Sequence, residues 1–144
     1  MSTAEQLWGE ISHPASLRFV SAPLLHFEPL VAGDLDGEWV VGKTYPLQLS
    51  LFGFLPAGEH RITLVTIDRK TNLIESKESG ALAPLWNHAI RFHPLEDGKL
   101  HYTDEIEIRA GLLTGVVWAF AHLFYRHRQR RWKVLLRRKT KGAV

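Results

Sequence analysis

Apolar and polar side chains alternate over much of the middle of the chain, which is the pattern of half-buried β-strands. In residues 45–51 the apolar side chains occupy every second position, and residues 59–68 are rich in the β-branched types that favour strands. The turn at Pro56-Ala57-Gly58 lies between them, so the two segments are expected to pair as a hairpin. Residues 73–79 predict a further strand, whose polar composition is typical of a sheet edge.

A second hairpin is predicted over residues 86–93 and 100–109, which alternate on either side of an Asp97-Gly98 turn. The body of the protein is therefore expected to be an antiparallel meander. One face of each strand is assigned to the core by the alternation: Tyr45, Leu47, Leu49, Leu51, Ile62, Leu64, Trp86, His88, Ile90, Phe92, Tyr102, Asp104, Ile106 and Ile108.

The first 44 residues follow no long period, because prolines and glycines interrupt them. Residues 16–20 and 24–27 are predicted to be short strand pieces. Residues 1–14 contain no lysine or arginine and no apolar run of the length that a signal peptide needs, so secretion by that route is not expected.

A long helix is predicted over residues 112–138, where the apolar period changes to that of a helix. On a helical wheel its core-facing stripe comprises Leu113, Val116, Val117, Phe120, Phe124, His127, Val134 and Leu135. The opposite face gathers Trp118, His122, Tyr125 and Gln129, an aromatic patch that predicts a homodimer contact. The apolar part, residues 110–125, is shorter than the roughly 20 residues of a membrane-spanning helix, although the basic residues after it leave a C-terminal anchor as an alternative.

Charge is strongly segregated along the 144 residues, a length that suits one domain. Half of the 18 basic residues lie in the segment Arg126–Lys141, which contains no acidic residue. Such a segment predicts weak binding to polyanions or to a membrane surface, or docking on the acidic remainder of the protein itself. We expect a single domain over residues 1–139, with a flexible basic end over 140–144.

The absence of cysteine excludes disulfide scaffolds, thiolate metal sites and cysteine nucleophiles, and it is compatible with the expected cytoplasmic location. No metal site is expected, because His88 and His93 face opposite sides of a strand and His122 and His127 are out of line on a helix. No phosphate loop, nucleophile elbow or His-Glu-x-x-His motif occurs, so no cofactor is expected and the common motif-bearing enzymes are not supported.

Three stretches of the sequence resemble the SRPBCC superfamily, which includes START-related lipid-binding domains and polyketide cyclases. They are Trp86-Asn87-His88-Ala89-Ile90-Arg91-Phe92, followed by Asp97-Gly98; Tyr102-Thr103-Asp104-Glu105-Ile106-Glu107; and Phe124-Tyr125-Arg126-His127-Arg128. The resemblance covers residues 45–132 and implies an α+β helix-grip fold, in which a curved antiparallel meander wraps around a long C-terminal helix. Most members carry two short helices between their first two strands, whereas residues 21–44 here are rich in proline and glycine, so those helices are expected to be missing or very short.

The resemblance implies binding of a hydrophobic or amphipathic small molecule between the sheet and the C-terminal helix. The residues expected to contact it are Tyr45, Leu49, Trp86, His88, Phe92, Tyr102, Asp104, Phe120 and Phe124.

Two of these candidates form the most informative polar feature. If the Asp97-Gly98 turn pairs Ile90 with Asp104, then His88 is a diagonal neighbour of Asp104, and a His88–Asp104 pair is predicted. The pair could fix the strand register, bind the ligand, or perform acid–base catalysis in a polyketide-cyclase-like enzyme. A further alternative is a protein without a ligand that acts through its basic C-terminal helix.

Overall fold

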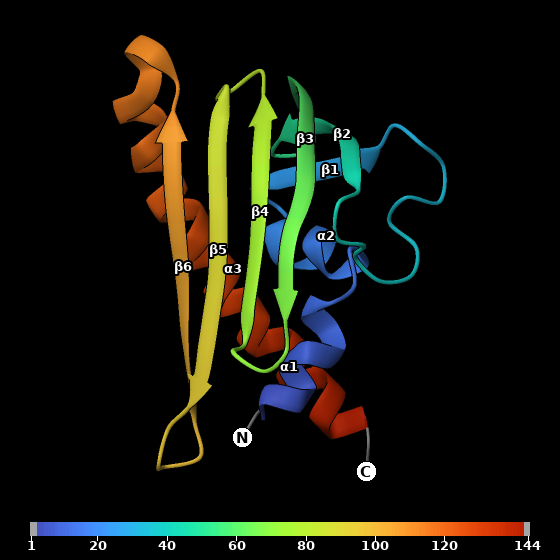
Figure 1. The fold of residues 1–144 in the computed structure, drawn as a ribbon. Helices are drawn as coiled ribbons and strands as arrows, with labels where there is room; N and C mark the ends of the chain where they lie inside the picture. Colours follow the sequence, from blue (N-terminus) through green and yellow to red (C-terminus); the bar gives the residue numbers. More distant parts are fainter. Residues whose placement is uncertain (1–2, 143–144) are drawn as a thin grey trace.

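The structure, a computed structural model, describes residues 3–142 and contains one antiparallel sheet with helices on one of its faces (Figure 1). Two short helices come first, then six strands, a 3-10 turn and a long helix. Their bounds are α1 (Ala4–Ile11), α2 (Ala15–Ser21), β1 (Leu25–Pro29), β2 (Thr44–Leu51), β3 (Leu55–Asp68), β4 (Leu73–Gly80), β5 (Leu85–Pro94), β6 (Leu100–Arg109), η1 (Gly111–Leu113) and α3 (Thr114–Gly142).

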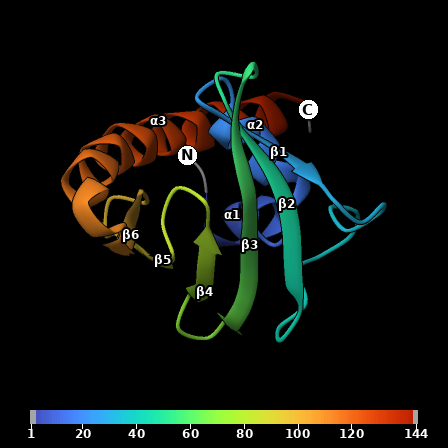
Figure 2. The same ribbon diagram turned by 90° about the horizontal axis from the view of Figure 1, so that it is seen from above.

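The strands follow one another in the sheet in the order of the chain, from β1 to β6, and each pairs antiparallel with the next. Figure 2 shows that the sheet curves, with α1, α2 and the later part of α3 on its inner side. The predicted fold class, an α+β arrangement of a curved antiparallel meander and a long C-terminal helix, is confirmed.

The register of the second hairpin is the predicted one. The turn at Gly98, whose φ of 78° suits glycine, brings Ile90 opposite Asp104 and His88 opposite Ile106. The residues assigned to the core on β2, β3 and β5 are buried except for Leu51, which is half-buried; those on β6 are also half-buried. The weaker burial of β6 follows from its place at the edge of the sheet.

The prediction of an edge strand over residues 73–79 is wrong, because β4 lies inside the sheet between β3 and β5. Its polar character has another cause. Ile74, Ser76 and Glu78 share the inner face, and the two polar side chains have hydrogen-bond partners there. Buried polar groups with partners made an interior strand look like an edge.

The prediction of a strand piece over residues 16–20 is also wrong, because these residues belong to α2. A helix of seven residues is too short to display a period in the sequence. The strand predicted at 24–27 exists as β1. No helix lies between β1 and β2. Instead α1 and α2, which precede β1, supply Ile11 and Leu17 to the inner side of the sheet, and His13 between the two helices lies there as well.

The core-facing stripe predicted for α3 is rotated from the true one. The buried residues are Ala121, Phe124, Tyr125, Arg128, Trp132 and Leu136, whereas Val116 is 69% exposed. The wheel predicts Tyr125 on the opposite face and does not place Arg128 in the stripe, yet both side chains are buried. Tyr125 is only 7% exposed, so it is not part of one exposed patch with Trp118, which is 58% exposed.

The C-terminal end of α3 packs against α1. Leu136 is buried, and Lys139 Nζ lies 3.6 Å from Glu10 Oε1. The end expected to be flexible, residues 140–144, is helical as far as Gly142, and residues 143–144 lie outside the described part of the chain. No helix within residues 3–142 is long and apolar enough to cross a membrane.

Candidate functional site

A cavity of about 80 Å³ lies between the inner face of the sheet and α3. Its apolar walls come from α1, α2, five of the strands and α3: Ile11, Leu17, Leu25, Phe27, Leu49, Ile62, Leu64, Ile74, Ile90, Phe120 and Phe124. Charged and polar side chains line one part of it: His60, Ser76, Glu78, His88 and Arg128. The cavity therefore combines apolar walls with buried ionisable groups, as small-molecule sites do.

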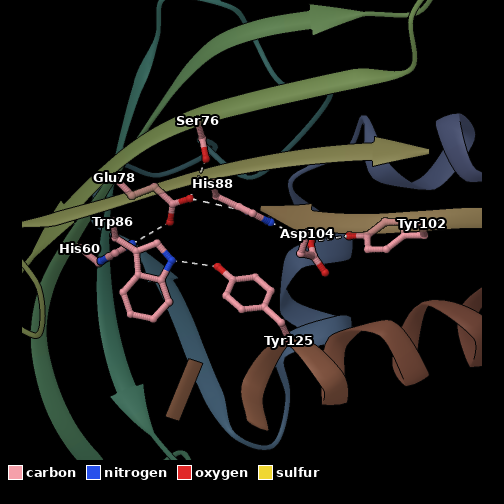
Figure 3. A network of polar contacts seen from close by, with 8 residues as sticks. All are labelled: His60, Ser76, Glu78, Trp86, His88, Tyr102, Asp104 and Tyr125. Carbon is pink, nitrogen blue, oxygen red and sulfur yellow. Dashed lines mark hydrogen bonds and ion pairs between the residues drawn. The ribbon is translucent and has the colours of Figure 1, made fainter. Parts of the chain in front are cut away.

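Glu78 lies at the centre of the polar cluster (Figure 3). His60 Nε2 is 2.9 Å from Glu78 Oε1, and Ser76 Oγ donates a hydrogen bond of 2.6 Å to Oε2. The side chains of Glu78 and His60 are 10% and 8% exposed. Gly80, opposite His60 in the register, leaves room for the imidazole, because a Cβ there would lie 2.7 Å from His60 Nδ1.

The predicted His88–Asp104 pair is present, and it is one part of a longer chain of contacts. His88 Nε2 lies 2.8 Å from Asp104 Oδ1, and His88 Nδ1 lies 3.9 Å from Glu78 Oε2. Tyr102 donates a hydrogen bond of 3.0 Å to Asp104 Oδ1, and Gln129 of α3 donates one of 3.0 Å to Oδ2. The His88 ring thus lies between two buried carboxylates, those of Glu78 and Asp104.

The pKa values of both carboxyl groups lie below their ordinary range. Burial alone would raise the pKa of Glu78, but the hydrogen bond and charge of His60 and the charge of His88 outweigh it. Burial also opposes ionisation of Asp104, and the hydrogen bond and charge of His88, with the charge of Arg128, lower its pKa. Both groups are therefore ionised at neutral pH.

Two tyrosines beside the cluster stay protonated. Burial, followed by the negative charge of Asp104, holds the pKa of Tyr102 well above its usual value, and burial with the charge of Glu78 does the same for Tyr125. Trp86 Nε1 donates a hydrogen bond of 2.8 Å to the hydroxyl oxygen of Tyr125. The Tyr125 ring also lies 4.9 Å from the His88 ring, between centroids, and covers the cluster from the side of α3.

Arg128 brings a permanent positive charge to the cavity wall. The residue is 6% exposed, and its guanidinium lies 5.3 Å from the centroid of the Tyr125 ring and 5.8 Å from that of Phe124. Burial alone would lower its pKa, but the surrounding tyrosines and carboxylates raise it, so the group stays charged. Arg128 Nε has no hydrogen-bond partner.

Five of the nine predicted ligand-contacting residues line this cavity: Leu49, Trp86, His88, Phe120 and Phe124. Tyr45, Phe92, Tyr102 and Asp104 do not. The Tyr45 hydroxyl accepts a hydrogen bond from Val40 N, and the Phe92 ring packs 5.2 Å from the Trp8 ring, so both are structural. Tyr102 and Asp104 lie behind His88 and act on the cavity through it.

The residues that the sequence analysis missed are His60, Glu78, Tyr125 and Arg128. Strand alternation carried the signal for two of them, since His60 is in phase with Ile62 and Glu78 with Ile74. The spacing from Phe124 to Arg128 and on to Trp132 carried the signal in the helix. Among residues 3–142, no group of three or more acidic or histidine side chains is arranged to hold a metal ion.

A wider cleft of about 500 Å³ lies outside the cavity, between α1, β6 and the end of α3. Leu7, Leu100, Tyr102 and Leu136 contribute to it, and Lys133, Arg137 and Lys141 line it as well. Trp132 lines both the cleft and the inner cavity, and its Nε1 has no hydrogen-bond partner. The basic segment of the sequence therefore meets apolar side chains at this cleft.

Comparison with known proteins establishes the family and the fold. The crystal structure of protein CV1439 from Chromobacterium violaceum is similar to this one, with a TM-score of 0.72 over 94% of this chain and 90% of that chain. Its sequence is 14% identical, so the likeness concerns the fold alone. A search of the curated proteins finds no match. The family model described as Domain of unknown function (DUF8410) matches residues 1–138, and the chain therefore belongs to the DUF8410 family.

Proposed function

We propose that the protein binds a small amphipathic molecule in the cavity between the sheet and α3. The observation that carries the proposal is the set of buried ionisable side chains, His60, Glu78, His88 and Arg128, at the wall of an otherwise apolar cavity. Burying a charged side chain opposes folding unless another interaction compensates for the lost hydration. In a core that only stabilises the fold, apolar residues would stabilise it as well as these side chains do. The resemblance to the SRPBCC superfamily supports the same site, because its members bind ligands between sheet and helix.

The volume of the cavity limits the size of the ligand. An engineered cavity of about 150 Å³ in another protein takes one benzene molecule. The cavity here, at about 80 Å³, suits a molecule smaller than benzene. The proposed ligand is therefore a short aliphatic compound with one polar end, rather than a long lipid.

Cavity filling tests the proposal. The purified protein is titrated with propionate, propanamide and propanol while its methyl resonances are followed by NMR. We expect at least one of them to shift resonances of Leu49, Ile62 or Leu64, and Ile74→Phe, which fills the cavity, to abolish the shifts. Val65→Phe adds the same ring at an exposed position of β3 and should leave them unchanged. If Ile74→Phe responds like the unaltered protein, or no compound shifts these methyl groups, the proposal fails.

A second candidate function is a polyketide-cyclase-like enzyme that uses His88 and Asp104. The observation in its favour is that His88 lines the cavity while two ionised carboxylates orient its ring, an arrangement suited to acid–base catalysis. His88→Gln separates the two functions. An enzyme would lose turnover of a compound that still binds, whereas a binding protein would show no turnover in either form.

The other expected partners stay proposals. Trp118 and His122 are exposed on α3 and could contribute to a homodimer, and Lys133, Arg137 and Lys141 offer positive charge to a polyanion or an anionic membrane surface. A cytoplasmic location fits a chain without cysteine, since such a chain needs no oxidising compartment.

A further inference from the structure

We propose that the ligand of the inner cavity is a carboxylate and that Arg128 is the residue that binds its charged end. The inference rests on the proposed function, because it names the chemical class of the molecule in that cavity. It starts from Arg128, which is buried, positively charged and one of the residues that line the cavity.

One donor of the Arg128 guanidinium, its Nε, is buried without a hydrogen-bond partner. Among the ion pairs of residues 3–142, none joins Arg128 to a carboxylate within 4.0 Å. The rings of Phe124 and Tyr125 lie beside it and offer no strong acceptor. A buried N–H donor without an acceptor is costly, because it has lost its hydration without replacement.

The two carboxylates of the polar cluster do not need Arg128. Both oxygens of Glu78 accept hydrogen bonds, one in the contact with His60 and the other from Ser76. Both oxygens of Asp104 are also occupied, by His88, Tyr102 and Gln129. Arg128 therefore interacts with these carboxylates through its charge but makes no hydrogen bond to either, and its Nε remains available to a molecule in the cavity.

A carboxylate matches the Arg128 guanidinium in shape and charge. The guanidinium is a planar fork that can donate two parallel hydrogen bonds to the two oxygens of one carboxylate. Phe120, Phe124 and Leu17 line the same cavity and can receive a short aliphatic chain. The volume of about 80 Å³ then points to a short-chain carboxylate such as propionate.

A ligand carboxylate adds a negative charge close to Glu78 and Asp104, which oppose it. Arg128 supplies a permanent positive charge among the side chains that line the cavity, whereas Tyr125 and Gln129, which face the cluster from α3, are uncharged. The attraction between Arg128 and the ligand carboxylate has to exceed the repulsion from Glu78 and Asp104, and comparing a charged ligand with an uncharged one of the same shape measures this difference.

The test compares propionate with propanamide, which has the same shape and no charge, by calorimetry and NMR. We expect propionate to bind the unaltered protein at least ten-fold more tightly than propanamide does. Arg128→Met should weaken propionate about ten- to hundred-fold and leave propanamide unchanged. Arg130→Met, at an exposed position two residues further along α3, should change neither affinity.

The outcomes separate the inference from the proposed function. Equal affinities for the two compounds, or unchanged propionate binding in Arg128→Met, would overturn the assignment of a carboxylate while the cavity remains a binding site. If neither compound binds and Ile74→Phe has no effect on any ligand, both proposals fail. Should Arg128→Met not fold, Arg128→Lys keeps the charge and loses the fork, and an unchanged propionate affinity in that variant would also contradict the inference.

Discussion

At the scale of single residues, the inner face of the sheet is organised by Glu78 rather than by the His88–Asp104 pair alone. Its carboxylate is within hydrogen-bond distance of His60 and Ser76, and its Oε2 lies 3.9 Å from His88 Nδ1. The pair itself could be predicted because two facts sufficed, strand alternation and the register fixed by an Asp-Gly turn. Glu78 was missed because its strand looked polar throughout, and only the partners from β3 and β5 show which of its polar residues are buried.

Neutralising Glu78 should destabilise the protein strongly. Glu78→Gln keeps the shape of the side chain but removes its charge and turns one acceptor oxygen into a donor, so one of the two contacts, to His60 or to Ser76, loses its acceptor. We expect the free energy of unfolding in urea to fall by about 1–3 kcal/mol, as when a buried polar group loses its hydrogen-bond partner. Glu107→Gln, on the exposed face of β6, should change it by less than about 0.5 kcal/mol. Similar effects of the two substitutions would contradict the central role of Glu78.

The lowered pKa values of Glu78 and Asp104 predict the sign of the pH dependence. A carboxyl group whose pKa is lower in the folded state stabilises that state above its unfolded pKa, near 4 for these residue types, and the contribution is lost as the pH falls through the folded value. Urea unfolding should show stability decreasing from about pH 5 downwards. In Asp104→Asn the decrease should be shallower, and an equally steep one would mean that Asp104 does not contribute.

At the scale of elements, the strands were predictable and the rotation of the long helix was not. A strand has a period of two residues, so a few apolar side chains fix which face is inward, even where His88 interrupts the series. On a helical wheel the buried face is inferred from the apolar side chains of many turns together. Because Arg128 and Tyr125 lie on the buried face of α3, the apolar stripe is displaced towards Val116 and His127. The two N-terminal helices were missed for a different reason, because each is at most eight residues long.

The corrected face of α3 makes a prediction about its phenylalanines. Phe124 is buried and stacks parallel to Phe120, with 6.1 Å between ring centroids. Phe124→Ala should therefore cost about 3–5 kcal/mol in chemical denaturation, as buried aromatic truncations do. Val116→Ala, within the stripe that the sequence predicts for the core, should cost less than about 0.5 kcal/mol, because Val116 is exposed. A larger loss for Val116 than for Phe124 would contradict the buried face of α3 and support the sequence-predicted one.

At the scale of the whole molecule, the basic end of the chain has two separable roles. Leu136 joins α3 to α1, whereas Lys133, Arg137 and Lys141 line the outer cleft without an ion pair to any acidic group among residues 3–142. Sequence composition could identify the charge but could not tell docking from solvation, because that depends on which residues α1 brings opposite the helix end.

Two variants distinguish these roles. A chain that ends at Trp132 should have a lower midpoint of thermal unfolding, since it lacks the buried Leu136. Replacing Lys133, Arg137 and Lys141 together by glutamine should leave that midpoint nearly unchanged and weaken binding to heparin, with a shallower dependence on salt. If the triple variant unfolds at the same reduced temperature as the shortened chain, the charges are structural and the polyanion hypothesis loses its basis.

The Trp132 side chain separates the inner cavity from the outer cleft. It should therefore set an upper limit on the chain length of a ligand in the inner cavity. The side chain is buried and lines both spaces. Trp132→Ala should join the cavity and the cleft into one channel that extends from the His88 imidazole to Lys133. Octanoate should then compete with propionate for the cavity, whereas in the unaltered protein Trp132 should prevent this competition. If Trp132→Ala leaves the selectivity between the two acids unchanged, another residue sets the limit on chain length. On this view one side chain determines whether the fold accepts short acids or long ones.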